Sequence, residues 1–161
     1  MSTVYDASLY PAAAVIDDDI TTLCATQSSA NAWVSVRLAP ATPVRFVAVY
    51  NRGDAPQYQV WLSPFEVWVG AFYGDTSSAT AFKCADMDVL TGPGPFIASC
   101  EQAHEGPPLP PALPAPSAPS TSELGVYVTV RQAGNARFLT LAEVRVCTPP
   151  PPPQPPSSPP I

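Results

Sequence analysis

Residues 45–70 read RFVAVYNRGDAPQYQVWLSPFEVWVG, and this stretch decides the fold class. At residues 46–50, aromatic and β-branched side chains cover both faces of an expected strand. At residues 65–69, phenylalanine and two valines alternate with other residues. Patterning with a period of two predicts β-strands. The polar tip at residues 51–54 predicts a turn, and such tips on a rigid sheet commonly carry binding groups.

Similar patterns predict strands along the rest of the chain. Trp61 and Leu62 predict a short strand of their own, and Ala12–Ile16 is either one helical turn or an edge strand. No stretch keeps a helical period over three turns. Seven or eight short strands separated by turns therefore predict an all-β antiparallel sandwich or barrel. The longer expected strands are residues 33–38, 45–51, 64–69, 80–84, 96–100, 125–131 and 138–146.

Proline is concentrated in two segments. The chain has 161 residues and 23 prolines, which gather at residues 107–119 and 149–160. Because proline lacks an N–H and fixes φ, these segments are unsuited to helix or sheet and favour a polyproline conformation. We therefore expect one β-domain at residues 1–147, with a proline-rich insertion at residues 107–119, and a proline-rich tail or linker at residues 148–161.

The charge pattern excludes two classes of partner. Charged residues make up 12% of the chain, the net charge is −6, and the basic residues form no cluster. Nucleic acids and anionic membrane surfaces both require a basic footprint, so neither is an expected partner. No apolar run reaches the roughly 20 residues that cross a bilayer, and no secretory signal peptide is visible. The chain is therefore expected to be either a processed piece of a longer protein or intracellular.

The four cysteines favour the first of these alternatives. Cys24, Cys84, Cys100 and Cys147 form no CxxC pair and have no histidine set nearby, which argues against zinc. Their even number predicts two disulfides and an extracellular or cell-surface location, with buried free thiols as the alternative. Cys84 and Cys100 flank a Gly-Pro-Gly-Pro turn and are expected to close a hairpin, which would contribute about 3 kcal/mol. A Cys24–Cys147 bond would tie the start of the domain to its end.

Several segments occur in the order and spacing of a known family. From about Ser8 to Cys147, interrupted by the insertion, the chain resembles the F-type lectin (fucolectin) branch of the discoidin-like, galactose-binding-domain fold. The resemblance implies an eight-stranded antiparallel jelly-roll β-sandwich, with a structural calcium ion and a sugar site in loops at one end. The proline-rich segments are similar to those of hydroxyproline-rich wall glycoproteins. The segments that carry the family resemblance are AVIDDD (14–19), TTLC (21–24), NAWVSVRL (31–38), VYNRGD (49–54), FEVWVG (65–70), GPFIASC (94–100), GVYVTVRQAG (125–134) and FLTLAEVRV (138–146).

The resemblance places a sugar site around the Arg-Gly-Asp tip, but with an incomplete set of contacts. The family's fucose motif joins a histidine, an Arg-x-Asp and a second basic residue. Arg52 and Asp54 supply the middle element, while the second basic position falls on Gln59. The histidine position falls on Ala25 or near Thr26. The usual fucose mode is therefore not expected, and another glycan held by the Arg-x-Asp element and an exposed aromatic ring, Tyr58 or Trp61, is the alternative.

The resemblance also implies a calcium site. Calcium prefers six to eight oxygen ligands that mix carboxylates with backbone carbonyls. The carboxylates would come from Asp17 and Asp19 in the acidic loop and from Glu143 on the last strand. Carbonyls near Ala14, Thr22 and Ala142 would complete the set. A solvated acidic loop without a metal is the alternative reading of the three consecutive aspartates.

Two functions remain open from the sequence. The first is an extracellular carbohydrate-binding module, stabilised by calcium, whose partners are glycans or glycoproteins. The second is a structural interaction domain of a proline-rich extracellular matrix or surface glycoprotein assembly, which contacts other proteins through its proline-rich segments. Enzymatic activity is not expected, because His104, the only histidine, has no nucleophile or orienting group near it in the sequence.

Overall fold

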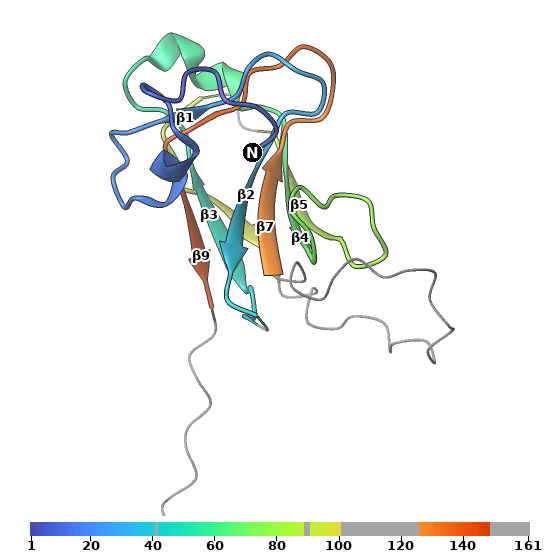
Figure 1. Ribbon diagram of the computed structural model, residues 1–161. Coiled ribbons are helices and arrows are strands. Elements are labelled where there is room, and N and C mark those ends of the chain that lie inside the picture. Colours follow the sequence, from blue (N-terminus) through green and yellow to red (C-terminus); the bar gives the residue numbers. More distant parts are fainter. Residues whose placement is uncertain (41, 89–90, 101–125, 149–161) are drawn as a thin grey trace, which may run out of the picture.

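The computed structural model describes residues 1–40, 42–88, 91–100 and 126–148. Within these residues a four-stranded sheet, in the order β2-β7-β4-β5, faces a three-stranded sheet, β6-β3-β9 (Figure 1). A short pair, β1-β8, lies at one end, and every strand pairing is antiparallel. The expected all-β antiparallel sandwich is therefore confirmed. The elements are η1 (Ala12–Ile16), β1 (Cys24–Ala25), β2 (Trp33–Leu38), β3 (Phe46–Tyr50), η2 (Pro56–Trp61), β4 (Phe65–Gly70), β5 (Phe82–Met87), β6 (Phe96–Ser99), β7 (Val126–Arg131), β8 (Thr140–Leu141) and β9 (Glu143–Cys147).

Valine fills most of the space between the two main sheets. Inward-facing valines alternate along the strands, and each is nearly or fully buried. Because β-branched side chains pack well on a pleated surface, this alternation fixes which face of each strand is turned inward. Phe65 and Leu62 close the core near the end that carries η2. The inward-facing valines are Val34 and Val36 of β2, Val47 and Val49 of β3, Val67 of β4, Val128 and Val130 of β7, and Val144 of β9.

Most expected strands are found, with four differences. The described residues contain nine strands: the expected strand at residues 138–146 is divided at Ala142 into β8 and β9, and β1 (Cys24–Ala25) was not among the expected strands. The short strand expected at Trp61 and Leu62 is wrong, since Trp61 ends the 3-10 helix η2. Ala12–Ile16 forms the helical alternative, η1.

The disulfide between Cys84 and Cys100 is confirmed, but the hairpin around it is wrong. The two Cα atoms are 4.6 Å apart. However, β5 pairs with β4, whereas β6 pairs with β3 in the opposite sheet. Cys84 is the extra residue where the β4–β5 register shifts, so it has no partner in the ladder. The disulfide therefore joins the two sheets.

The expected bond between Cys24 and Cys147 is wrong, because the two cysteines lie at different ends of the sandwich. Cys24 is buried in β1, opposite Leu141. Cys147 is exposed at the end of β9, opposite Phe46. Six residues of extended chain separate Leu141 from Cys147, or roughly 20 Å at the rise of a β-strand. Both thiols are free.

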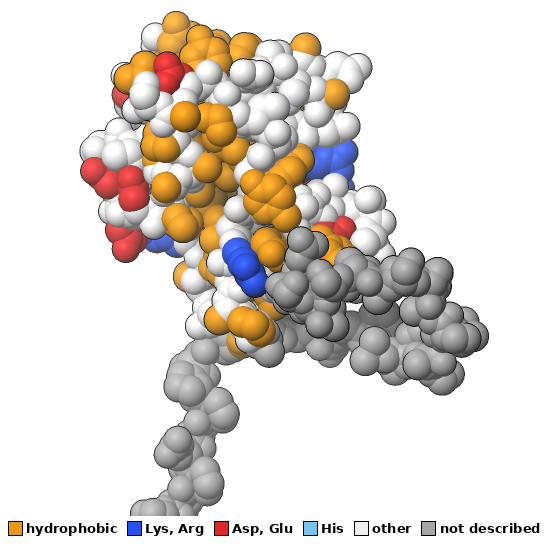
Figure 2. All heavy atoms as spheres, in the orientation of Figure 1, with side chains coloured by type: hydrophobic (Ala, Val, Ile, Leu, Met, Phe, Trp, Pro, Cys, Tyr) orange, Lys and Arg blue, Asp and Glu red, His pale blue; other side chains and the backbone are white. Residues whose placement is uncertain are grey.

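Loops at the η2 end of the sandwich carry several exposed apolar side chains. Figure 2 shows hydrophobic side chains gathered at this end and over the N-terminal segment, with acidic side chains beside η1. No helix in the described part of the chain is long and apolar enough to cross a membrane. The insertion at residues 107–119, His104 and the tail beyond Thr148 lie outside the described residues. The exposed apolar side chains at this end and in the N-terminal segment are Val4, Tyr5, Leu9, Ile16, Ile20, Tyr58, Val60 and Trp61.

Candidate functional site

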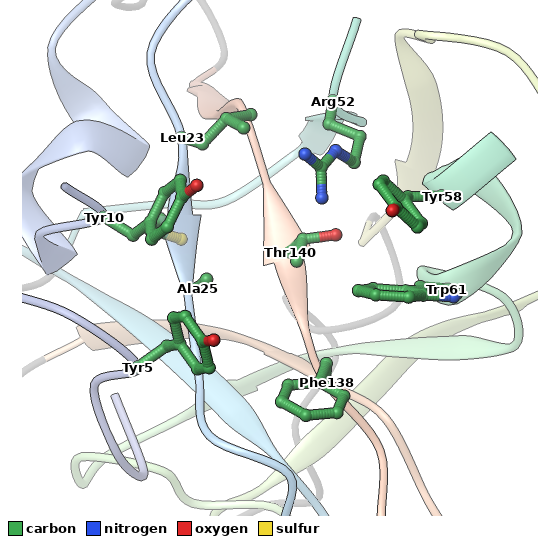
Figure 3. A pocket seen from close by; sticks show the side chains of 10 residues that line it. Tyr5, Tyr10, Leu23, Ala25, Arg52, Tyr58, Trp61, Phe138 and Thr140 are labelled. Atoms are coloured by element: carbon green, nitrogen blue, oxygen red, sulfur yellow. The ribbon is translucent and has the colours of Figure 1, made fainter. Parts of the chain in front are cut away.

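A pocket of about 240 Å³ opens among the loops at this end. Aromatic side chains stand around it, the guanidinium of Arg52 projects into it, and Thr140 lies at its centre (Figure 3). The lining comes from segments far apart in the sequence, which the β1–β8 pair and η2 bring together. The lining residues are Tyr5, Tyr10, Leu23, Cys24, Ala25, Arg52, Tyr58, Trp61, Phe138 and Thr140.

The local sequence explains how Arg52 and the two aromatic residues of η2 are placed. Strand β3 ends at Tyr50, so Arg52 follows shortly after the end of the central strand of its sheet. Pro56 begins η2, where its fixed φ and missing N–H fit the first helical turn. The helix then presents Tyr58 and Trp61 three residues apart, and in a 3-10 helix such side chains lie one above the other. Their ring centroids are 4.5 Å apart.

Arg52 is held by Asp54 in a two-point ion pair. Arg52 Nε and Nη2 donate to the two oxygens of Asp54 at 2.9 and 2.8 Å. This hydrogen bonding raises the pKa of Arg52 and lowers that of Asp54. The guanidinium carbon also lies 5.0 Å from the centroid of the Tyr58 ring. Arg52 is only 9% exposed, and among the described residues its Nη1 has no hydrogen-bond partner. The arrangement fixes the side chain and leaves one donor free.

Gln59 supports Arg52 from behind and does not line the pocket. Its Nε2 donates to the carbonyl of Arg52 at 3.1 Å, and its Oε1 accepts the N–H of Gly92 at 2.8 Å. Its own carbonyl accepts a hydrogen bond from Asn51 Nδ2 at 2.8 Å. The residue is buried. The expectation that Gln59 contacts a ligand is therefore corrected: the phase of η2 turns it toward the backbone.

Thr26 is also placed away from the pocket. It is 1% exposed, and its hydroxyl accepts the N–H of Leu139 at 3.0 Å. Its backbone N–H donates to the carbonyl of Leu139 at 3.0 Å. Thr26 therefore joins the chain after β1 to the chain before β8, which corrects its expected role as a ligand contact. Of the expected ligand residues, the structure brings Arg52, Asp54 and Tyr58 together.

The aromatic side chains form a continuous arc around the pocket, which we call the aromatic arc. It runs in the order Tyr58, Trp61, Phe138, Tyr5 and Tyr10 (Figure 3). The successive ring centroids are 4.5, 5.7, 6.1 and 6.1 Å apart. The stacking of Trp61 on Phe138 links η2 to the segment before β8. The sequence analysis selected only Tyr58 and Trp61, and the other three rings come from segments whose convergence no local pattern reveals.

Thr140 presents a second polar group that lacks a protein partner. The residue is 4% exposed, and its hydroxyl has no hydrogen-bond partner among the described residues. Figure 3 shows it between the arc and Arg52. A buried hydroxyl without a partner costs free energy, so a ligand that bonds to it would recover that cost. The sequence analysis did not find Thr140, because a threonine in a strand is ordinarily read as a β-former.

Cys24 lines the same pocket without offering a reactive group. Burial raises the pKa of its thiol to about 12. The thiol therefore stays protonated at neutral pH and is a poor nucleophile. No acidic or histidine side chain is among the described residues that line the pocket. The arrangement suits reversible binding through aromatic faces and hydrogen bonds.

The residues expected to bind calcium lie where η1 and the acidic loop meet the start of β9. Glu143 is 2% exposed, and its Oε2 has no hydrogen-bond partner among the described residues. Burial, and then the nearby carboxylate of Asp17, raise the pKa of Glu143. Ala14 and Ala142 are buried in η1 and directly before β9. An unpartnered buried carboxyl group beside a second carboxylate favours a cation.

The rest of the acidic loop is engaged in its own hydrogen bonds. Asp17 Oδ2 accepts the hydroxyl of Thr22 at 2.8 Å. Asp19 Oδ1 accepts both the N–H and the hydroxyl of Thr21, at 2.9 and 2.6 Å. Within the described ranges, no group of three or more histidine, cysteine, aspartate or glutamate side chains is arranged to hold a metal ion. Asp17 Oδ1 also accepts the N–H of Asp19 at 3.0 Å, so both aspartates hold hydrogen bonds within their own loop. A calcium ion at Glu143 would therefore draw on loop carboxylates that already accept hydrogen bonds.

Comparison with known proteins identifies the fold. Comparisons with family models and with curated protein sequences found no match. Solved structures do match. The lectin domain of lectinolysin complexed with Lewis B antigen is 22% identical, with a TM-score of 0.64, over 92% of this chain and 90% of that one. A fucolectin from serum of the striped bass Morone saxatilis is 22% identical, with a TM-score of 0.65, over 90% of this chain and 44% of that one.

The chain has the discoidin-like fold of the F-type lectins. An F5/8 type C domain from Bacteroides fragilis matches as well, at 18% identity and a TM-score of 0.58, over 90% of this chain and 86% of that one. The expected resemblance is thereby confirmed at the level of the fold.

Proposed function

We propose that the chain is an extracellular carbohydrate-binding module of the lectin type, and that the pocket around Arg52 is its sugar site. The observation that carries the proposal is a pair of polar groups beside aromatic faces, Arg52 Nη1 and the Thr140 hydroxyl, which have no hydrogen-bond partner in the part of the chain that the structure describes. Sugars present apolar faces that stack on aromatic rings and hydroxyl or ring oxygens that accept hydrogen bonds. Support also comes from the matching lectinolysin domain, which was solved in complex with Lewis B antigen.

The residues favour a sugar held through few polar contacts. Both oxygens of Asp54 accept hydrogen bonds from Arg52, so the role of Asp54 is to orient the guanidinium. Gln59 supports the backbone instead of supplying a second cation. The ligand is therefore expected to rely on stacking against Tyr58, Trp61 and Phe138, with Arg52 and Thr140 setting its orientation. The complete fucose motif is absent, so fucose in the usual mode is not the proposed ligand.

Calcium is proposed as a structural ion of the same domain. Glu143 and Asp17 would supply carboxylate oxygens, and carbonyls near Ala14, Thr22 and Ala142 would supply the remainder. The bound ion would neutralise the buried carboxyl group of Glu143 and fasten the acidic loop to β9. We expect calcium to raise the thermal midpoint of unfolding and a chelator to lower it. Glu143→Gln should remove this calcium dependence, and an equal response in that variant would contradict the site.

The sugar site is tested with a glycan array on the full chain, with calcium and again with a chelator. Saturable binding to one class of sugar is expected. Arg52→Ala should abolish it, because no other cationic side chain lines the pocket among the described residues. Arg37→Ala is the matched control, since Arg37 is exposed on β2 outside the pocket and its loss changes the charge equally. Equal loss of binding in both variants would refute the assignment.

The second candidate function is a structural interaction domain of a proline-rich matrix or surface assembly. It is favoured by the exposed apolar side chains at the pocket end and by the two proline-rich segments of the sequence. Lack of binding to any glycan, from protein shown to be folded, would favour this function over the first. We propose no catalytic role, because the pocket-lining residues within the described ranges offer neither an acid–base pair nor an ionised thiol.

A further inference from the structure

Every polar side-chain group that lines the pocket within the described residues can donate a hydrogen bond. The indole Nε1 of Trp61 and the Nη1 of Arg52 can only donate, and neither has a hydrogen-bond partner in the described part of the chain. The phenol groups of Tyr5, Tyr10 and Tyr58 are likewise unpaired there. No carboxylate or amide side chain lines the pocket within the described ranges. The site therefore suits a ligand with apolar bodies and carbonyl acceptors, even one that has no donor of its own.

A proline-rich peptide has this chemistry. Its rings stack on aromatic faces, and its residues lack the backbone N–H. In the polyproline II conformation the carbonyl groups have no internal partners and point outward. Aromatic-lined grooves that recognise such segments use this preformed conformation, which lowers the entropy cost of binding. The aromatic arc around Arg52 offers the same combination of flat rings and donors.

The chain itself contains a segment of this kind. Residues 149–161 read PPPPPQPPSSPPI, in which nine of thirteen residues are proline and none is charged. An uncharged segment matches this pocket, because Asp54 neutralises Arg52, the one cationic side chain among the described residues that line it. At the polyproline rise of about 3.1 Å per residue, thirteen residues reach about 40 Å. That reach is sufficient to enter a pocket on another molecule.

The position where this segment begins points to a second copy as the recipient. The pocket lies at the end of the sandwich that carries η2 and the β1–β8 pair, whereas β9 ends at Cys147 at the opposite end (Figure 1). Because proline-rich segments are stiff, we expect one that begins at that end to extend away from the pocket of its own copy. Contacts from one copy to the next are then head-to-tail and extend into chains.

We propose that the pocket binds the proline-rich tail, residues 149–161, of a second copy of this chain. The prolines occupy the aromatic arc, and Arg52 and Trp61 donate to tail carbonyls. The tail uses the pocket of the proposed sugar site, but its binding does not depend on sugar binding. Where a sugar also binds, the two ligands exclude each other, so glycan would release the contact between copies.

The direct test titrates the full chain, labelled with ¹⁵N, with a synthetic peptide of residues 149–161 and follows the amide and side-chain shifts. Shifts confined to the pocket, at Arg52, Tyr58, Trp61 and Thr140, are the expected result. A control peptide with glycine at positions 149–153 should cause smaller shifts, because it loses five rings and the polyproline preference. Absence of shifts at millimolar peptide, or shifts only at a site away from the pocket, would overturn the proposal.

Variants of η2 sharpen the test. Trp61→Ala should weaken peptide binding by about tenfold or more, and Val60→Ala by less than about twofold, because Val60 is exposed beside the arc without lining the pocket. Sedimentation velocity on the full chain should show concentration-dependent association that added peptide reverses. Association that Trp61→Ala leaves intact would refute the pocket contact. Peptide binding without glycan binding would support the tail contact and reject the sugar site. Glycan binding without peptide binding would support the sugar site and reject the tail contact.

Discussion

The loop around Arg52 and the loop around Asp75 each bury a charged group in a connection that leaves the sandwich. Asp75 is 8% exposed, and Ser78 donates to both of its oxygens, through its N–H at 3.1 Å and its hydroxyl at 2.6 Å. The hydroxyl of Thr80 adds a third bond at 3.2 Å. In the pocket, by contrast, Arg52 Nη1 and the Thr140 hydroxyl have no partner among the described residues.

This difference separates structural polar groups from binding groups. A carboxylate whose neighbours satisfy it within its own loop stabilises that loop and has little left to offer a ligand. A donor group that is held in place without a hydrogen-bond partner lowers the stability of the fold. The same group is available to bind a ligand. The comparison predicts that changes near Asp75 alter stability alone, whereas changes in the pocket alter binding more than stability.

The largest effect is expected at Gln59, a structural polar group that also supports the binding residue Arg52. Gln59→Ala removes one buried and one partly buried hydrogen bond, and it takes the Gln59 side chain away from the Arg52 carbonyl and the Gly92 N–H. We expect a loss of about 3 kcal/mol in the free energy of unfolding, together with weaker ligand binding. Urea unfolding measures the first effect. Gln57→Ala, an exposed position on the same helix, should change neither quantity. Unchanged stability in Gln59→Ala would show that the support is not needed.

Asp75→Ala comes next and should affect stability alone. The variant loses the hydrogen bonds from Ser78 and Thr80, so we expect a decrease of about 2 kcal/mol in the free energy of unfolding. Ligand binding at the pocket should be unchanged. Asp86→Ala is the matched control, since this aspartate is mostly exposed and its pair with Lys83 is worth less than about 1 kcal/mol. Weaker ligand binding in Asp75→Ala would break the distinction between the two loops.

Thr140→Val should show the opposite pattern at a smaller magnitude. The substitution keeps the shape of the side chain and removes a buried hydroxyl that has no hydrogen-bond partner among the described residues. Stability should stay the same or rise by up to about 1 kcal/mol, while ligand binding weakens. Thr129→Val is the matched control: Thr129 is fully buried and bonded to the Ser35 hydroxyl at 2.7 Å, so its loss should destabilise the domain. Equal destabilisation by both variants would show that the Thr140 hydroxyl is structurally engaged.

The fold could be predicted largely from local patterns, because a strand with one buried face shows apolar residues at every second position of its sequence. Where the sequence prediction failed, the deciding contacts were non-local. The Gly-Pro-Gly-Pro segment suggested a hairpin between the strands that carry Cys84 and Cys100, yet β5 pairs with β4 and β6 pairs with β3. The positions of Cys24 and Cys147 near the start and the end of the domain suggested a disulfide between them. In the structure Leu141, not Cys147, lies opposite Cys24.

The site could be predicted only in part for the same reason. Arg52 could be predicted as a binding residue because it belongs to a short polar motif, Arg-Gly-Asp, that is recognisable from the local sequence. Tyr5 and Phe138 lie more than 130 residues apart and meet only when β1 pairs with β8. Gln59 shows a different failure: counting along the chain placed it at a sugar contact, but the phase of a 3-10 helix turned it inward. Spacing alone does not determine which way a side chain points.

The smallest expected effect is a pH dependence that isolates the charge of Asp75. Burial acts to raise the pKa of this carboxyl group, but the hydrogen bonds from Ser78, Ser77 and Thr80 outweigh it and lower the pKa overall. A carboxyl group with a lowered pKa in the folded state stabilises the fold above its unfolded pKa, about 3.9, and this contribution disappears as the pH falls through the folded value. The stability gap between the native chain and Asp75→Asn should therefore narrow between pH 7 and pH 2.5, by less than about 1 kcal/mol. Urea midpoints of both proteins at the two pH values measure the gap. A stability gap that stays constant with pH would mean that the charge of Asp75 does not contribute to stability. Asp75 would then act only as a polar side chain that accepts hydrogen bonds from its own loop.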